Sequence, residues 1–195
     1  MRRLFLLLPL ACGCRGGLEA DLADLRAEIQ KMERDVPPDE PLWITEGPNA
    51  FEPHIEDYSA RVPDFIYNHV ARKLIAMKTD EILAQLQGPF DTDAAFKDPK
   101  ALRGRFWKAT GTIANLEPIA VAERDLGVKT MYAGVLFADH RPILFHVADK
   151  GEIVYLGQDT VEVNGVFVKL LSYTARNGKR VDAPFLMGRR LGKYY

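Results

Sequence analysis

The sequence predicts a mainly β protein with helical extensions, of the α+β class. From residue 99 onward, apolar and polar residues alternate in long runs, which is typical of strands. Before that point, apolar residues recur at helical spacing in two stretches. The hydrophobic fraction of 47% and the charged fraction of 27% are those of a folded globular chain. We therefore divide the sequence into five segments: 1–14, 17–36, 37–62, 63–88 and 99–195.

Residues 1–14 have the pattern of an export signal. Two arginines precede the apolar run of residues 4–11, which is much shorter than the roughly 20 residues needed to cross a bilayer. Because Cys12 and Cys14 follow at once, the segment resembles a bacterial lipoprotein signal. This resemblance implies export to the periplasm or outer membrane, with a lipid on Cys12 or Cys14 that tethers the protein to the membrane. The rest of the chain has no cysteine, which excludes a disulfide framework and a Cys-type zinc site.

Residues 17–36 have the heptad spacing of a short coiled-coil helix that Pro37 and Pro38 end. The seam consists of Leu18, Leu22, Leu25, Ile29, Met32 and Val36. With fewer than three heptads, the helix either self-associates through residues 18–36 or packs on the body of the protein. The proline-rich segment 37–62 contains Trp43, Ile44 and Phe51, so we expect it to dock on the body instead of forming a free linker.

Residues 63–88 are predicted to form one amphipathic helix. Asp64 is the expected N-cap, and Gly88-Pro89 is the expected end. We expect the helix to cover one face or one end of the β domain; contact with a membrane surface is the alternative.

Five main strands are predicted in the β domain, and Gly111 and Gly165 are expected to allow bends in the first and fourth. Asn177-Gly178 predicts a hairpin between the last two strands. Five strands in about 90 residues suit a Greek-key β-barrel of the OB type. Residues 149–158 are too short and Gly-rich for the helix usual between the third and fourth strands, so SH3-like or lipocalin-like closure stays open. The predicted strands are 106–116, 129–138, 142–148, 161–174 and 184–191.

Three sequence runs in the second half of the chain resemble uncharacterised exported bacterial proteins with a C-terminal OB-like domain. These runs are Arg103-Gly104-Arg105 leading into Ala109-Thr110-Gly111, the stretch 163–169 followed by Tyr173, and Ala183 to Arg189. The resemblance implies the fold and brings no catalytic residue.

The sequence contains no pattern that indicates catalysis. None of His54, His69, His140 and His146 has the spacing of metal ligands, and nucleotide-binding and nucleophile motifs are missing. His146 lies on the face opposite Phe145 and Val147, where we expect it at the surface or in the barrel lumen. We therefore expect neither an enzyme, a cofactor nor a metal site.

The candidate ligand-binding surface combines basic and aromatic residues of strands that are neighbours in an OB barrel. Residues 99–195 carry 15 Lys and Arg against 9 Asp and Glu, whereas the preceding part is acidic. In an exported protein, such a surface would recognise a protein or an anionic glycan; single-stranded nucleic acid is the alternative if the chain is not exported. The expected ligand-binding residues are Arg103, Arg105, Lys108, Tyr132, Lys169, Tyr173, Arg189 and Arg190.

Overall fold

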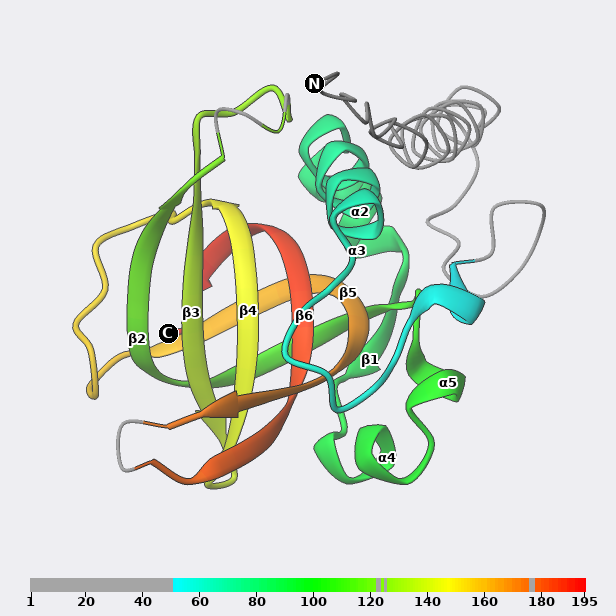
Figure 1. Cartoon of the computed structure of the whole chain (residues 1–195). Helices are drawn as coiled ribbons and strands as arrows, with labels where there is room; N and C mark the ends of the chain where they lie inside the picture. The colour runs from blue at the N-terminus through cyan, green and yellow to red at the C-terminus, as the bar shows by residue number, and fades with distance from the viewer. Residues whose placement is uncertain (1–50, 122–123, 125, 176–177) are drawn as a thin grey trace, which may run out of the picture. The chain divides into compact units, whose positions relative to one another are not determined.

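The computed structural model describes residues 51–121, 124, 126–175 and 178–195 (Figure 1). These residues belong to the second of two compact units, which spans 39–195. The expected export signal, the coiled-coil arm and most of the proline-rich segment lie outside the described residues, as does Asn177 of the predicted hairpin.

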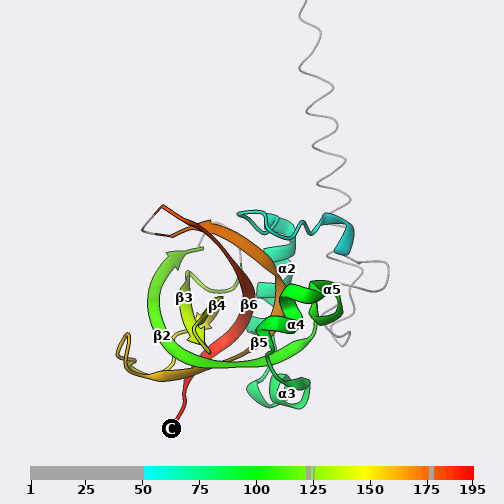
Figure 2. The ribbon, with the colours of Figure 1, turned by 90° about the horizontal axis from the view of Figure 1, so that it is seen from below.

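Five long strands pair into a closed ring, so the mainly β prediction is confirmed. They are β2 (Phe106–Ala120), β3 (Thr130–Ala138), β4 (Arg141–Asp149), β5 (Thr160–Thr174) and β6 (Arg180–Lys193). Their order is β2-β3-β4-β6-β5, and β2 also pairs with β5, which closes the ring. The view from below shows the strands around a common centre (Figure 2). Four pairings of the ring are antiparallel, and β4–β6 is parallel.

The long strand β2 closes the ring because it pairs with β5 over its first part and with β3 over its second part. The first part of β2, Phe106–Thr112, pairs with β5, whereas Thr112–Ala120 pairs with β3. Gly111 lies where the pairing changes, and a Cβ there would be 2.3 Å from the carbonyl oxygen of Phe137. A residue without a side chain is therefore required at this close approach.

The interior of the ring is filled by apolar side chains from all five strands. On β4, the predicted face of Ile143, Phe145 and Val147 points to this cluster, as period-two alternation requires. Ala95 and Leu102, from the two short helices described below, belong to the same cluster.

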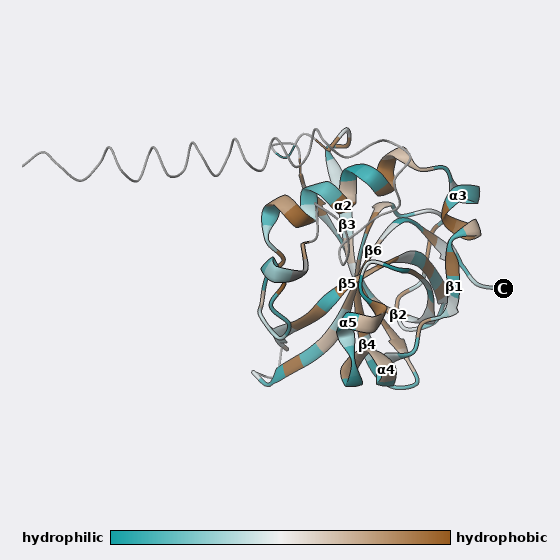
Figure 3. Ribbon diagram, turned by 90° about the vertical axis from the view of Figure 1, so that its right-hand side faces the viewer, coloured by the Kyte–Doolittle hydropathy of each residue, from teal (hydrophilic) through white to brown (hydrophobic). Residues whose placement is uncertain are grey.

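A second apolar cluster lies between the helix α2 (Asp64–Ala76) and the outer face of the ring. Ile66, Val70 and Leu74 of α2 are fully or almost fully buried in it. Phe185 and Met187 of β6 face this cluster, whereas Leu186 between them faces the interior. The helix alternates between hydrophobic and hydrophilic residues along its length (Figure 3). The helix α2 thus covers one face of the sheet.

The expected single helix over 63–88 is wrong in its extent. The structure has α2, then α3 (Thr79–Ala84), then a short strand β1 (Leu86–Pro89) that pairs in parallel with β2. Met77 and Lys78 are extended, and the Lys78 N–H donates to the Glu81 carboxylate at 2.8 Å, which begins a new helix. Pro63 occupies the N-cap of α2, so Asp64 is its first helical residue and not the predicted cap.

Two further helices, α4 (Thr92–Lys97) and α5 (Pro99–Leu102), were not predicted. Asp91 and Asp98 are their N-caps, and each carboxylate accepts a hydrogen bond from the backbone N–H three residues later. Pro99 at the first position of α5 is a further start signal. The caps were visible in the sequence, but helices this short carry no readable periodicity.

The segment before α2 docks on the ring. Phe51 is buried against α2, and the short helix η1 (Glu52–His54) follows it. Residues 55–62, which we call the strap, then run beside β5. The Tyr58 N–H donates to the Leu170 carbonyl at 2.9 Å, and the Ser172 N–H donates to the Ser59 carbonyl at 3.3 Å. The strap therefore covers part of the edge of β5 that β6 does not occupy.

Candidate functional site

The eight predicted ligand-binding residues do not form one exposed surface. Lys108 pairs with Glu162 at 3.1 Å, and Arg190 pairs with Asp149 at 3.4 Å. Arg105 is exposed, whereas Arg189, Tyr132 and Tyr173 are half-buried. The remaining two, Arg103 and Lys169, are buried. Cys12 and Cys14, the predicted lipidation sites, lie outside the described residues.

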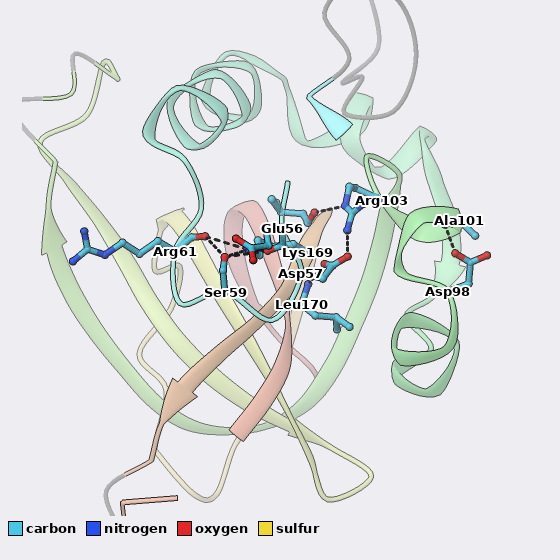
Figure 4. A network of polar contacts seen from close by, with 10 residues as sticks. Glu56, Asp57, Ser59, Arg61, Asp98, Ala101, Arg103, Lys169 and Leu170 are labelled. Carbon is cyan, nitrogen blue, oxygen red and sulfur yellow. Dashed lines mark hydrogen bonds and ion pairs between the residues drawn. The ribbon is translucent and has the colours of Figure 1, made fainter. Parts of the chain in front are cut away.

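Arg103 and Lys169 hold the strap on the ring from below its surface (Figure 4). The Lys169 ammonium donates to the Ser59 hydroxyl at 2.5 Å, to the Arg61 carbonyl at 3.1 Å and to the Glu56 carbonyl. Burial lowers the pKa of Lys169, and the carboxylates of Asp57 and Glu56 oppose this effect. Lys169 therefore serves to fix the strap and is not available on an outer surface.

Arg103 makes a parallel connection through Asp57. Its Nη2 donates to Asp57 Oδ2 at 2.5 Å, and its Nε donates to the Val168 carbonyl at 2.9 Å. The other carboxylate oxygen of Asp57 accepts the Leu170 N–H at 2.9 Å. A buried guanidinium requires such compensation, and its position is explained by this network.

The molecule has a cavity at a different place from these residues. A cavity of about 610 Å³ lies on the outer face of β3 and β4, bounded by α2, the strap and the far part of β2. Twelve of its nineteen described lining residues are apolar. The polar ones are Arg61, Asp64, Tyr67, Asn115, Glu117, Arg124 and His146. None of the eight predicted ligand-binding residues is among those described as lining it.

Tyr67 and His146 form a polar pair in the cavity wall. The Tyr67 hydroxyl lies 2.9 Å from His146 Nδ1 and donates to Met131 Sδ at 3.4 Å. The His146 ring also packs edge-on against Phe185, with ring centroids 4.9 Å apart. Burial raises the pKa of Tyr67 to about 12, which the Arg124 guanidinium opposes. Burial, with a smaller contribution from Arg124, lowers the pKa of His146 to about 4. Both side chains are therefore uncharged near neutral pH.

Arg124 lies over this pair from the β2–β3 connection. Its guanidinium is 5.0 Å from the centre of the Tyr67 ring, in a cation–π contact. The same guanidinium donates to the Asp64 carboxylate at 2.9 Å and to the Asn68 amide oxygen at 3.3 Å. Arg124 thus connects the β2–β3 connection to the first turns of α2.

The residues of this cavity were missed by the sequence analysis. Tyr67 lies in the predicted helix of residues 63–88, and the sequence analysis gave it no role. Alternation placed His146 opposite Phe145 and Val147, but it left open whether that face is the surface or the lumen, and it does not show that a helix covers it. The perturbed pKa values of the pair in a cavity are a physical indication of a functional site.

Within the described part of the chain, no group of three or more His, Cys, Asp or Glu side chains could hold a metal ion. No helix there is long and apolar enough to cross a membrane. No protein-family model matches the chain, and no curated protein has a sequence similar to it.

Proposed function

We propose that the chain is an exported binding protein of the bacterial cell envelope, tethered to the membrane by a lipid on Cys12 or Cys14, without catalytic activity. Its ring of strands is an OB-type barrel, and the cavity on β3 and β4 is its ligand site. The arm of residues 18–36 brings copies of the protein together. The signal-like N-terminus supports the export part, and the strand pairing supports the barrel part.

The strand order supports an OB-type barrel. In chain order, the ring reads first, second, third, fifth and fourth strand, and the third and fifth strands are parallel. This is the Greek-key arrangement of OB barrels. The chain departs from that pattern between β4 and β5, where the described residues contain no helix; α2, which precedes the ring, packs on it instead.

The position of the cavity carries the functional proposal. OB barrels bind ligands on the face of the second and third strands and at the loop between the first two. Here these elements are β3, β4 and the β2–β3 connection, and the cavity is lined by Val135, Leu144 and Arg124 from them. A cavity of this size, mostly apolar with a few convergent polar groups, has the properties of a ligand site.

The partner is a protein, with an anionic glycan as the alternative from the basic composition of residues 99–195. The apolar lining favours a protein, because glycans are bound largely through hydrogen bonds and open aromatic faces. The aromatic side chains of the cavity offer no such face, since Tyr67, Phe145 and Phe185 are at most 7% exposed.

Photo-cross-linking of the full chain in its native host tests the proposal. A photoreactive amino acid at Val135, inside the cavity, should give a light-dependent adduct of polypeptide mass. The same group at Ala114, an exposed residue of β2 outside the cavity, should not. Equal adducts, or none at position 135, would contradict the cavity as a binding site for a protein. An adduct that glycosidase removes would make the partner a glycan.

The same cells test the tether. Uncross-linked protein in the membrane fraction should have the mass of a chain that starts at Cys12 or Cys14 and carries acyl groups. A full-length, unmodified chain in the soluble fraction would overturn export. It would also favour nucleic acid as the ligand, with binding that falls steeply as salt rises.

A further inference from the structure

The cavity also indicates which kind of chemical group it binds, an inference that rests on the proposed role of the cavity as the ligand site. Its floor is formed by outward-facing residues of neighbouring strands. Ala133 and Val135 of β3 lie beside His146 and Leu144 of β4, and Leu144 lies beside Phe185 of β6. A ligand that binds on this floor leaves water and contacts apolar side chains and one histidine ring.

The charges around the cavity provide no buried counter-ion for a charged ligand. Arg124 is committed to Asp64 at 2.9 Å. Arg61 and Glu117 are exposed and of opposite sign, and the Arg61 side chain extends away from the strap network (Figure 4). Their fields at the floor are therefore screened by water and partly cancel each other.

The Tyr67–His146 pair leaves one ring nitrogen of the histidine open. His146 Nδ1 is engaged with the Tyr67 hydroxyl at 2.9 Å, and which of the two donates depends on the tautomer of the imidazole. In a neutral imidazole, Nε2 accepts a hydrogen bond when Nδ1 carries the hydrogen, and donates one when it does not. Nε2 has no hydrogen bond to the described residues, and it is not enclosed, because the enclosed side-chain polar atom without a partner among them is Asn164 Oδ1. Since His146 lines the cavity, Nε2 is open to it.

We propose that the cavity binds an uncharged group with a hydrocarbon body and one hydroxyl or amide, which lies on Ala133, Val135 and Leu144 and forms a hydrogen bond with His146 Nε2. An aliphatic alcohol and an apolar peptide segment share this chemistry. A carboxylate does not fit, because its charge would lose water without gaining a counter-ion.

Binding of small probes to the full chain tests this inference. In NMR titrations at pH 7.5, 1-octanol should shift the methyl signals of Val135 and Leu144. Octanoate, with the same chain length, should bind at least about tenfold more weakly because its carboxylate must be desolvated. Equal or tighter binding of octanoate would overturn the inference.

Variants of the cavity floor test whether octanol binds in the cavity. Ala133→Leu fills the floor and should abolish octanol binding, whereas Ala114→Leu makes the same change at an exposed position of β2 and should leave it unchanged. If Ala133→Leu does not fold, Val135→Phe fills the same space from the next position on that face. Octanol binding that survives in the folded filled variants would contradict the assignment.

A third probe separates the two sources of the ligand chemistry. N-acetyl-trileucine amide binding more tightly than octanol indicates a protein segment, and the reverse indicates a lipid alcohol. The two proposals can fail separately. If octanoate binds more tightly than octanol but the cross-link is specific to the cavity, the cavity is still the ligand site and the inference of an uncharged ligand is wrong. If octanol binds but no cross-link forms, the cavity binds an uncharged ligand and the proposed protein partner is wrong.

Discussion

At the scale of single residues, Arg103 shows that an arginine expected to bind a ligand at the surface can instead be a buried structural residue. A surface arginine and a buried arginine look alike in a sequence. Here the guanidinium donates from Nη2 to the carboxylate of Asp57, 46 positions earlier, at 2.5 Å, and from Nε to the Val168 carbonyl. The side chain is fully buried, so its charge must be matched inside the protein.

Removal of the matching charge should therefore destabilise the fold. Asp57→Asn keeps the shape but leaves the Arg103 guanidinium buried without a carboxylate. We expect a loss of about 3 kcal/mol in the free energy of unfolding, measured by urea denaturation. The double variant Asp57→Asn/Arg103→Met should recover part of this loss, because the buried charge is gone. A single variant within about 0.5 kcal/mol of the parent would show that the ion pair does not stabilise the fold.

At the scale of elements, close approach between strands explains the position of a glycine inside β5. The sequence led us to expect a bend at Gly165, and the pairing of β5 with β6 is irregular between Val163 and Gly165. A Cβ at Gly165 would be 2.3 Å from the Met187 carbonyl oxygen and 3.0 Å from Gly188 Cα. Because both atoms are backbone, the strands must separate to admit a side chain.

Gly165→Ala should accordingly cost about 2 kcal/mol of stability, and Gly165→Val more. Gly192→Ala is the matched control in β6, since its new Cβ would meet its nearest neighbour at an ordinary 3.6 Å. Thermal and urea unfolding of both variants measure the difference. Similar stabilities for Gly165→Ala and Gly192→Ala would show that β5 and β6 are further apart than the structure has them.

At the scale of the whole molecule, a buried histidine, His69, and a half-buried one, His146, couple stability to pH. Burial lowers the pKa of His69 and of His146 to about 4, with smaller contributions from Lys73 and Arg72 in the first case and Arg124 in the second. In the unfolded chain, a histidine has a pKa of about 6.5. The unfolded state therefore binds more protons between these values, and stability falls as pH falls from about 6.5 to about 4.

We expect each histidine to contribute about 2 kcal/mol to the loss of stability between pH 7 and pH 4.5. His146→Gln, which can still hydrogen-bond to Tyr67, should reduce that loss by about this amount in urea titrations at the two pH values. His140→Gln, at an exposed turn between β3 and β4, is the control and should leave the loss unchanged. Equal acid sensitivity of the parent and His146→Gln would contradict the lowered pKa of His146.

Much of the β architecture follows from local patterns. Alternation over residues 142–148 predicted β4 and which of its side chains share a face, because successive side chains of a strand point to opposite sides whatever the strand pairs with. The long strand that begins near Val161 was also predicted from its apolar and polar residues. The mixture of strands with helices, and a helix over one face of the sheet, could therefore be predicted without a structure. The signal-like N-terminus and the coiled-coil arm are features of the sequence alone and stay predictions.

Tertiary structure decided what covers each face and where charges are matched. Periodicity shows which side chains of a strand share a face, but not that α2 lies over His146 or that the strap supplies Asp57 to Arg103. Those contacts join residues 79 and 46 positions apart, and no local pattern encodes them. The closure of the ring by β2 and β5 is equally non-local. The candidate site therefore emerged only with the fold, because a cavity is created by the elements that surround it and not by the residues of any one of them.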